Sequence, residues 1–247
     1  MHKKTSLFLF IITIFYSCKN SEKKIFENQF QTKIEKRLFE NTENLITKYR
    51  EDSQKYWDKN DSENALKYED SSKAVILNSY IKDYEFKSVD NTIYNTADRK
   101  KPLFLQVTAS WCAPCRFEIT ALNKIVKKYS DKVDFVLLFW DTLSDLEKLA
   151  PDYNKDIYLI PSQEKQSEPT TIDISGFRHI MGFPSNYLIT TDNEIINFSQ
   201  GAIIPNTYAD QNGKEITITK EDADKRNYER LENEIKELIE KTSANKV

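Results

Sequence analysis

Glycine, histidine and cysteine are scarce in this chain of 247 residues. Only four glycines are present, and none forms the glycine-rich loop that cradles the phosphates of a nucleotide. The two histidines, His2 and His179, exclude catalysis that is built on several histidines. Two of the three cysteines could hold half of a zinc site, but such a site would need two further ligands, and no suitable cluster is evident. The sequence therefore predicts no metal and no cofactor.

Strong net charge and long apolar runs are also absent. The formal net charge is −3 and the pI is about 5.7, so nothing in the overall charge favours binding to nucleic acid. The apolar run from Leu7 to Tyr16 is about half as long as the roughly 20 residues that a membrane-spanning helix needs. Because the basic residues 2–4 precede this run, it is typical of a signal peptide.

The signal-like segment ends in Cys18. Residues 15–18, Phe-Tyr-Ser-Cys, resemble the end of a bacterial lipoprotein signal, although Phe15 stands where leucine is usual. We therefore expect residues 1–18 to be a signal peptide and Cys18 to carry lipid. The alternative is a plain secretory signal in which Cys18 is removed or incidental. Either reading predicts export, and lipidation predicts a protein of the bacterial cell envelope that is anchored to a membrane and faces the periplasm.

The most informative motif is Trp-Cys-Ala-Pro-Cys at residues 111–115. It follows a strand-like run, residues 103–107, and opens a helix-like run, residues 117–129. Two cysteines three positions apart on a first helical turn can close a reversible disulfide. The helix dipole and the unpaired backbone N–H groups favour a thiolate there, and the thiolate is the nucleophile in disulfide exchange. The alternatives are a structural disulfide and half of a metal site.

A second motif, Gly-Phe-Pro-Ser at residues 182–185, precedes another apolar run. Together the two motifs resemble the thioredoxin superfamily, and in particular the membrane-tethered TlpA/ResA-like thiol-disulfide oxidoreductases. The resemblance covers residues 81–245. It implies an α/β, thioredoxin-like fold, in which helices flank a mixed central sheet, with an N-terminal β-hairpin and a preceding helical segment.

The chain divides into three expected parts: a signal peptide at 1–18, a tether and helical region at 19–80, and a thioredoxin-like domain at 81–247. An apolar stripe from Phe26 to Leu38 and a segment from about Ser62 to Tyr80 predict helices. Strands are expected at 103–108, 133–140, 157–160, 185–190 and 194–199. Helices are expected at 112–129, 143–153 and 220–241. The remaining expected elements are a hairpin around residues 90–91, a loop at 161–175 and an added loop or hairpin at 203–219.

The resemblance also implies roles for individual residues. Cys112 is the expected nucleophile, and Cys115 is the cysteine that resolves the mixed disulfide. Pro184 resembles the superfamily's cis-proline, which would place the backbone of Phe183 against the dithiol. Supporting roles are expected for the residues that shape the site, which are Trp111, Pro114, Glu118, Phe183 and Pro184.

Glu118 has two readings. ResA-like proteins carry an acidic residue at this position, where it could raise a thiol pKa or relay a proton. Alternatively, Glu118 is a solvated glutamate on a helix face. Gln106 occupies the place of the buried aspartate of classical thioredoxin and cannot accept a proton, so proton transfer would pass to water or to Glu118. Arg116 is expected at the surface, His179 in a structural role, and Trp140 and Asp141 at the edge of the site.

The functional hypothesis is an exported, lipid-anchored thiol-disulfide oxidoreductase that reduces protein disulfides. Its expected partners are exported proteins with disulfides, a membrane electron donor that exchanges thiols with it, and the membrane itself, but no nucleic acid. An oxidant or isomerase on the same fold is the alternative enzyme, because the redox potential rather than the fold decides the direction. A non-catalytic scaffolding lipoprotein is the alternative outside enzymology.

Overall fold

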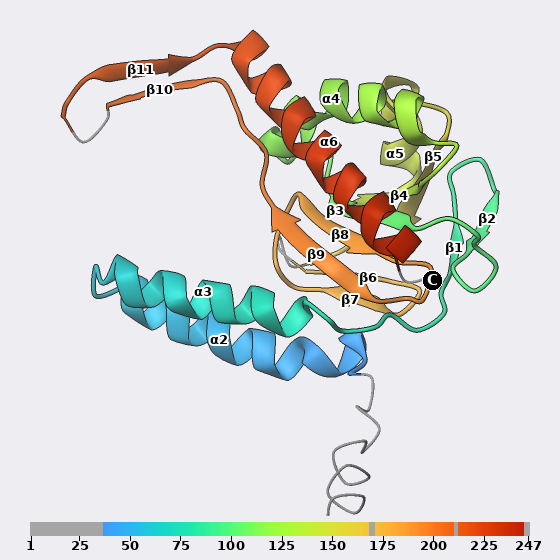
Figure 1. Ribbon diagram of the computed structural model, residues 1–247, viewed down its shortest axis with the longest axis horizontal. Coiled ribbons are helices and arrows are strands. Elements are labelled where there is room, and N and C mark those ends of the chain that lie inside the picture. Colours follow the sequence, from blue (N-terminus) through green and yellow to red (C-terminus); the bar gives the residue numbers. More distant parts are fainter. Residues whose placement is uncertain (1–36, 168–170, 210–211, 245–247) are drawn as a thin grey trace, which may run out of the picture. The chain divides into compact units, whose positions relative to one another are not determined.

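The computed structural model describes residues 37–167, 171–209 and 212–244, and these residues belong to one compact unit. Its centre is a five-stranded mixed sheet with the strand order β5-β4-β3-β8-β9 (Figure 1). The strands of this sheet are β3 (Leu103–Thr108), β4 (Asp134–Thr142), β5 (Ile157–Ser162), β8 (Ser185–Ile189) and β9 (Ile195–Gln200).

Two connections make the first half of the sheet parallel. Helix α4 (Ala113–Tyr129) joins β3 to β4, and α5 (Leu143–Leu149) with the short helix η2 (Ala150–Asp152) joins β4 to β5. Strand β8 then pairs antiparallel with β3, and β9 pairs antiparallel with β8. This arrangement confirms the predicted thioredoxin-like α/β fold.

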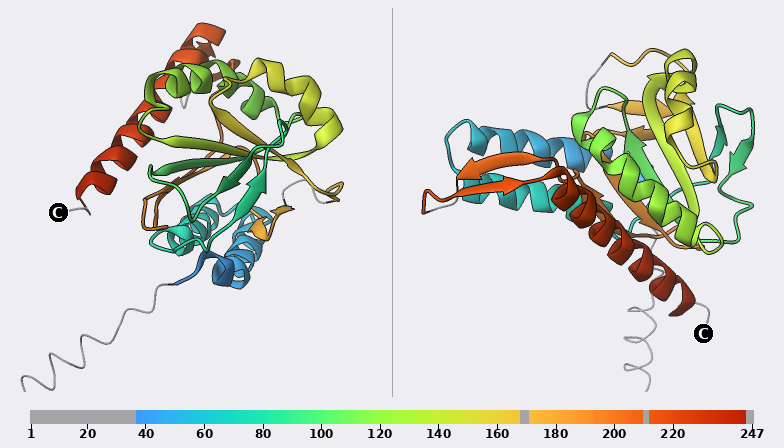
Figure 2. Two further views of the ribbon diagram at one scale, coloured as in Figure 1. Left: turned by 90° about the vertical axis from the view of Figure 1, so that its right-hand side faces the viewer. Right: turned by 90° about the horizontal axis from the view of Figure 1, so that it is seen from above.

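Helices cover both faces of the sheet (Figure 2). On one face, α4 packs beside the C-terminal helix α6 (Lys220–Ala244). The side chains of β3 alternate between the faces, as they must in a pleated strand. Phe104 points to the α4–α6 face, whereas Leu103 and Leu105 point to the opposite face. The polar residue Gln106 is thereby placed on the same face as α4.

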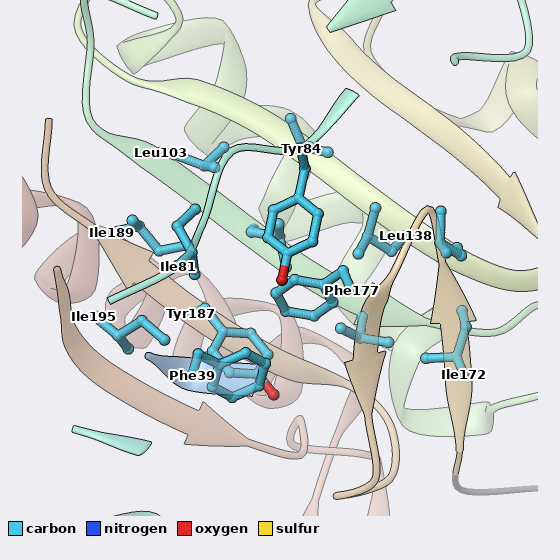
Figure 3. Close-up of a cluster of buried hydrophobic side chains, with 14 of the residues drawn as sticks. Phe39, Ile81, Tyr84, Leu103, Leu138, Ile172, Phe177, Tyr187, Ile189 and Ile195 are labelled. Atoms are coloured by element: carbon cyan, nitrogen blue, oxygen red, sulfur yellow. The ribbon is translucent and has the colours of Figure 1, made fainter. Parts of the chain in front are cut away.

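The opposite face is covered in part by residues that precede Cys112. The short helix η1 (Phe39–Thr42) leads into α2 (Glu43–Trp57) and α3 (Ser62–Ile76), which run side by side. Phe39 from η1 stacks on Phe177 and meets the edge of Tyr187 from β8 (Figure 3). Ile46 and Ile76 belong to the same buried cluster. These helices therefore complete the core on this face of the sheet. The part of the Phe26–Leu38 stripe before residue 37 lies outside the described residues.

The helix expected to reach Tyr80 ends at Ile76 instead. Leu77 is extended, and Asn78 has φ of 58°, which breaks the helix. The backbone then pairs along the outer edge of β9, where Ile195 donates to Ser79 and accepts from Asn78. Pairing with the sheet edge therefore overrides the helical pattern at these residues.

The expected loop at 161–175 is also corrected in part. Its last residues form the strand β6 (Ile172–Ile174), which pairs with β7 (Phe177–His179). Ser175 and Gly176 join them, both with positive φ, as a tight two-residue hairpin requires. The helix expected at 143–153 becomes α5 and then η2 because Pro151 cannot continue the α-helical hydrogen bonding.

Two further hairpins agree with the sequence. β1 (Glu85–Lys87) and β2 (Ile93–Asn95) form the hairpin expected around residues 90–91. β10 (Asn206–Ala209) and β11 (Glu215–Ile218) form a hairpin within 203–219 that extends away from the sheet in Figure 1. In the described part of the chain, no helix is long and apolar enough to cross a membrane.

Candidate active site

The two cysteines of the motif form a disulfide at the start of α4. Cys112 is the N-cap residue of this helix, and its Sγ accepts a hydrogen bond from the backbone N–H of Cys115 at 3.3 Å. Pro114 lies in the first turn, where its missing N–H leaves no hydrogen bond unmade. A sulfur at this position faces the positive end of the helix dipole, which stabilises a thiolate when the disulfide is reduced.

The segment that precedes β8 closes the other side of the dithiol. The peptide bond between Phe183 and Pro184 is cis, as the resemblance to the thioredoxin superfamily implied. The side chain of Phe183 packs against a small buried cluster that contains Ala109, Cys112 and Cys115. The two motifs, about 70 residues apart in the sequence, therefore meet at one site.

Aromatic side chains form the wall of the site. Trp111 is 50% exposed, and its ring meets the rings of Trp140 and Phe183 edge-on at centroid distances of 5.6 and 5.7 Å. Asp141, next to Trp140, accepts hydrogen bonds from the backbone N–H and the hydroxyl of Ser110. This carboxylate fixes the turn that carries Trp111. Both residues at the end of β4 therefore lie at the site, as the sequence suggested.

Comparison with known proteins agrees with this geometry. The chain is 28% identical over 111 residues to the thioredoxin-like protein YneN of Bacillus subtilis, covering 43% of this chain and 61% of that protein. Over this stretch the chain is similar to a thioredoxin-like protein. The resemblance to the thioredoxin superfamily that the sequence predicts is confirmed by this match. The match spans less than two thirds of the curated relative. No protein-family model matches the chain.

Two solved structures show similarity to this thioredoxin-like chain. A DsbE-type thiol:disulfide interchange protein from Chlorobium tepidum has a TM-score of 0.44 at 19% identity and covers 64% of this chain and 94% of its own. The exposed lipoprotein thioredoxin Etrx1 of Streptococcus pneumoniae has a TM-score of 0.38 at 20% identity and covers 50% of this chain and 92% of its own.

His179 supports the site through its contact with Phe183. It is fully buried and stacks on Phe183 at 5.9 Å between ring centroids. Its Nε2 lies 2.7 Å from the carbonyl of Gly182, which can only accept, so Nε2 carries the proton and Nδ1 accepts from the hydroxyl of Tyr187. Burial lowers the pKa of His179 to about 4, so the ring is neutral at pH 7. The structural role expected for this histidine agrees with these contacts.

Glu118 is buried, which rules out the solvated reading of this residue. Its side chain is 1% exposed and lies one helical turn after Cys115, on the buried face of α4. One carboxylate oxygen accepts a hydrogen bond from Nε2 of Gln106 at 2.6 Å, and the other accepts from the guanidinium of Arg230. Burial raises the pKa of Glu118 to about 7, even though the Arg230 charge and the Gln106 hydrogen bond oppose the rise.

The contacts of Glu118 belong to a closed ring of five side chains, which we call the acid ring. Gln106 also donates to Oδ1 of Asn186 at 2.9 Å, and Asn186 donates to Glu234 at 3.3 Å. Arg230 closes the ring by donating to Glu234 at 2.9 Å and to Glu118. The ring joins β3, α4, β8 and α6. It holds two carboxyl groups and one guanidinium in a space that is largely closed to water.

Sequence reasoning missed the α6 and β8 members of the acid ring. Arg230 and Glu234 are separated from Glu118 by more than 110 positions, and no motif links them. The one available signal is their i, i+4 spacing beside the buried stripe of α6, which contains Leu231 and Ile235. Among the described residues, no cluster of three His, Cys, Asp or Glu side chains is arranged to hold a metal ion.

Proposed function

We propose that this chain is an exported thiol-disulfide oxidoreductase that reduces protein disulfides through Cys112 and Cys115. The observation that carries the proposal is the disulfide at the N-terminus of α4, packed against Phe183 of the cis-proline segment. The general kind of reaction, thiol-disulfide exchange, is also supported by the match to a thioredoxin-like protein. The direction of electron flow, the substrates and the location are parts of the proposal.

The proposed reaction proceeds through two exchanges. The Cys112 thiolate attacks one sulfur of a substrate disulfide, forms a mixed disulfide and releases the first substrate thiolate. Cys115 then loses its proton and attacks Cys112, which releases the second substrate thiolate and leaves the Cys112–Cys115 disulfide. The substrate gains two electrons. A membrane donor with its own dithiol would return the protein to its reduced state by the same exchange.

The surrounding residues are proposed to bind substrate and to move the proton. The backbone of Phe183 would pair with an extended substrate segment, while Trp111 offers an exposed apolar surface beside the cysteines. Glu118 would accept the proton that Cys115 releases, because this carboxyl group lies one turn further along the same buried helix face. Pro114 would keep the first turn of α4 rigid.

A redox titration tests the proposed function. The protein without residues 1–18 is equilibrated in glutathione or dithiothreitol buffers, and its thiol content is measured. We expect a potential near the thioredoxin value of about −270 mV, because a reductase must hold electrons at low potential. A value near about −120 mV would assign the protein to disulfide formation instead. A pair that does not cycle would favour the scaffolding alternative.

Lipid anchoring is proposed from the sequence alone, because Cys18 lies outside the described residues. In this proposal the chain is held at a membrane of the bacterial cell envelope, facing the periplasm, through lipid on Cys18. Labelling cells with a tagged fatty acid tests it. We expect label on the wild-type chain and none on the Cys18→Ser variant, and equal labelling of both would contradict the anchor.

A further inference from the structure

The acid ring contains two charged residues, Arg230 and Glu234, to which the proposed reaction gives no role. Glu118 and Glu234 both contact Arg230, so two carboxyl groups share one guanidinium. The side chain of Glu234 is 9% exposed and that of Arg230 is 25% exposed. Two carboxylates that share one positive charge in such a place repel each other, and a proton on Glu118 relieves the repulsion. The ring is therefore built so that its charges act on the proton affinity of Glu118.

The groups that face Glu118 come from every element packed around it. Gln106 from β3 stabilises the carboxylate by donating to it, and Asn186 from β8 fixes the orientation of Gln106 because its Oδ1 accepts from the same amide. From α6, Arg230 attracts negative charge and Glu234 repels it. Tyr153, after η2, is neutral, because burial first and the charge of Glu118 second raise its pKa.

We propose that Arg230 and Glu234 are positioning residues that set the proton affinity of Glu118, and thereby the pH at which Cys115 can resolve a mixed disulfide. This inference rests on the proposed function. It assigns to the last helix of the chain, α6, a role in the chemistry at the first turn of α4. Arg230 stabilises the Glu118 carboxylate, and Glu234 opposes it.

The step controlled in this way is the attack of Cys115 on the mixed disulfide, together with the loss of its proton. The S–H bond of Cys115 breaks, and its proton moves to the Glu118 carboxylate. The Cys115 sulfur forms a bond with the sulfur of Cys112, and the substrate sulfur leaves with the electron pair of the broken S–S bond. If Glu118 is already protonated, it cannot take this proton. The resolving step is therefore expected to slow at pH values below the pKa of Glu118.

The fall of the resolving rate toward low pH is one limb of the pH–rate profile. The two α6 residues should shift this limb in opposite directions. Arg230→Met removes the attractive charge, so the pKa of Glu118 rises and the limb shifts upward by about one pH unit or more, a roughly tenfold loss of rate at a fixed pH on the limb. Glu234→Gln removes the repulsive charge, so the limb shifts downward. Arg230→Lys keeps the positive charge and should restore most of the wild-type profile. A merely structural role would not give shifts of opposite sign.

The experiment measures the single-turnover rate with which the reduced protein reduces a model peptide disulfide, between pH 5 and pH 8. In parallel, carboxyl carbons of glutamate are labelled with carbon-13 and titrated by NMR, which reports the pKa of Glu118 without any turnover. Glu118→Gln identifies the Glu118 signal and removes its limb, leaving the limbs of the thiols. Arg116→Ala removes an exposed charge beside Cys115 and is the matched control.

The outcomes separate the two proposals. The inference holds if the wild type reduces the peptide and if two shifts are seen. Both the limb and the Glu118 titration must move to higher pH in Arg230→Met and to lower pH in Glu234→Gln. If the wild type is active but neither variant moves the limb or the titration, the inference is wrong and the proposed function stands. If the wild type does not react at all, the proposed function itself fails. Should Arg230→Met not fold, Arg230→Lys and Glu234→Gln still decide the question.

Discussion

Replacing Cys112 with serine is expected to reduce disulfide exchange to the uncatalysed background. A hydroxyl at the N-cap can still accept the hydrogen bond from the backbone of Cys115, so the start of α4 should remain folded. What is lost is the thiolate, which is the attacking group in exchange. The measurement is the rate of reduction of a peptide disulfide at pH 7, together with a circular dichroism spectrum to confirm folding.

The Cys115→Ser variant should behave differently from Cys112→Ser. Cys112 can still attack the substrate, but nothing resolves the product, so the protein should accumulate as a mixed disulfide that mass spectrometry detects. Arg116→Ala, next to Cys115 but exposed, should leave exchange unchanged. Accumulation of the mixed disulfide in Cys112→Ser instead would show that the two cysteines have exchanged roles and would refute the assignment.

Replacing Phe177 with alanine is expected to lower the free energy of unfolding by about 3–5 kcal/mol, the range for removing a buried phenylalanine. Phe177 is fully buried, and its ring contacts Phe39 from η1, Tyr84 before β1 and Tyr187 from β8 (Figure 3). The substitution therefore opens a cavity where three separate segments of the chain meet. Urea denaturation of the oxidised protein, followed by tryptophan fluorescence, measures the loss.

Tyr208→Ala is the matched control for Phe177→Ala. Tyr208 is a large aromatic residue of β10 that is 45% exposed, so its removal should change the free energy of unfolding by no more than about 0.5 kcal/mol. Equal losses in the two variants would contradict the packing described here. A small loss in Phe177→Ala would mean that η1 and β7 do not complete a shared core.

Local signals explain why the dithiol could be predicted from the sequence. Cys112, Cys115 and Pro114 lie within four positions, and the strand before them and the helix after them follow from hydrophobic patterns of six and seventeen residues. The cis-proline segment was expected from the resemblance of Gly-Phe-Pro-Ser, residues 182–185, to the thioredoxin superfamily, and this motif directly precedes the buried strand β8. In each case the residues that determine the geometry are neighbours in the chain.

The missed features depend on residues that are distant in the chain. The environment of Glu118 could not be predicted because Arg230 comes from another helix, and a glutamate on an amphipathic helix is usually solvated. The strands β6 and β7 have three residues each, which is too short for an alternating pattern to stand out. The end of α3 was misplaced because pairing of Asn78 and Ser79 with β9 is a tertiary effect.

The acid ring also has a consequence for the order in which the site is built during synthesis. The chain emerges from its N-terminus, so Cys112, Cys115 and Glu118 are all made before the 112 further residues that lead to Arg230. Until α6 has been translated, the carboxyl group beside the cysteines lacks its guanidinium partner. The cysteines are therefore present early in the nascent chain, and the charges that surround them are complete only when the last helix docks.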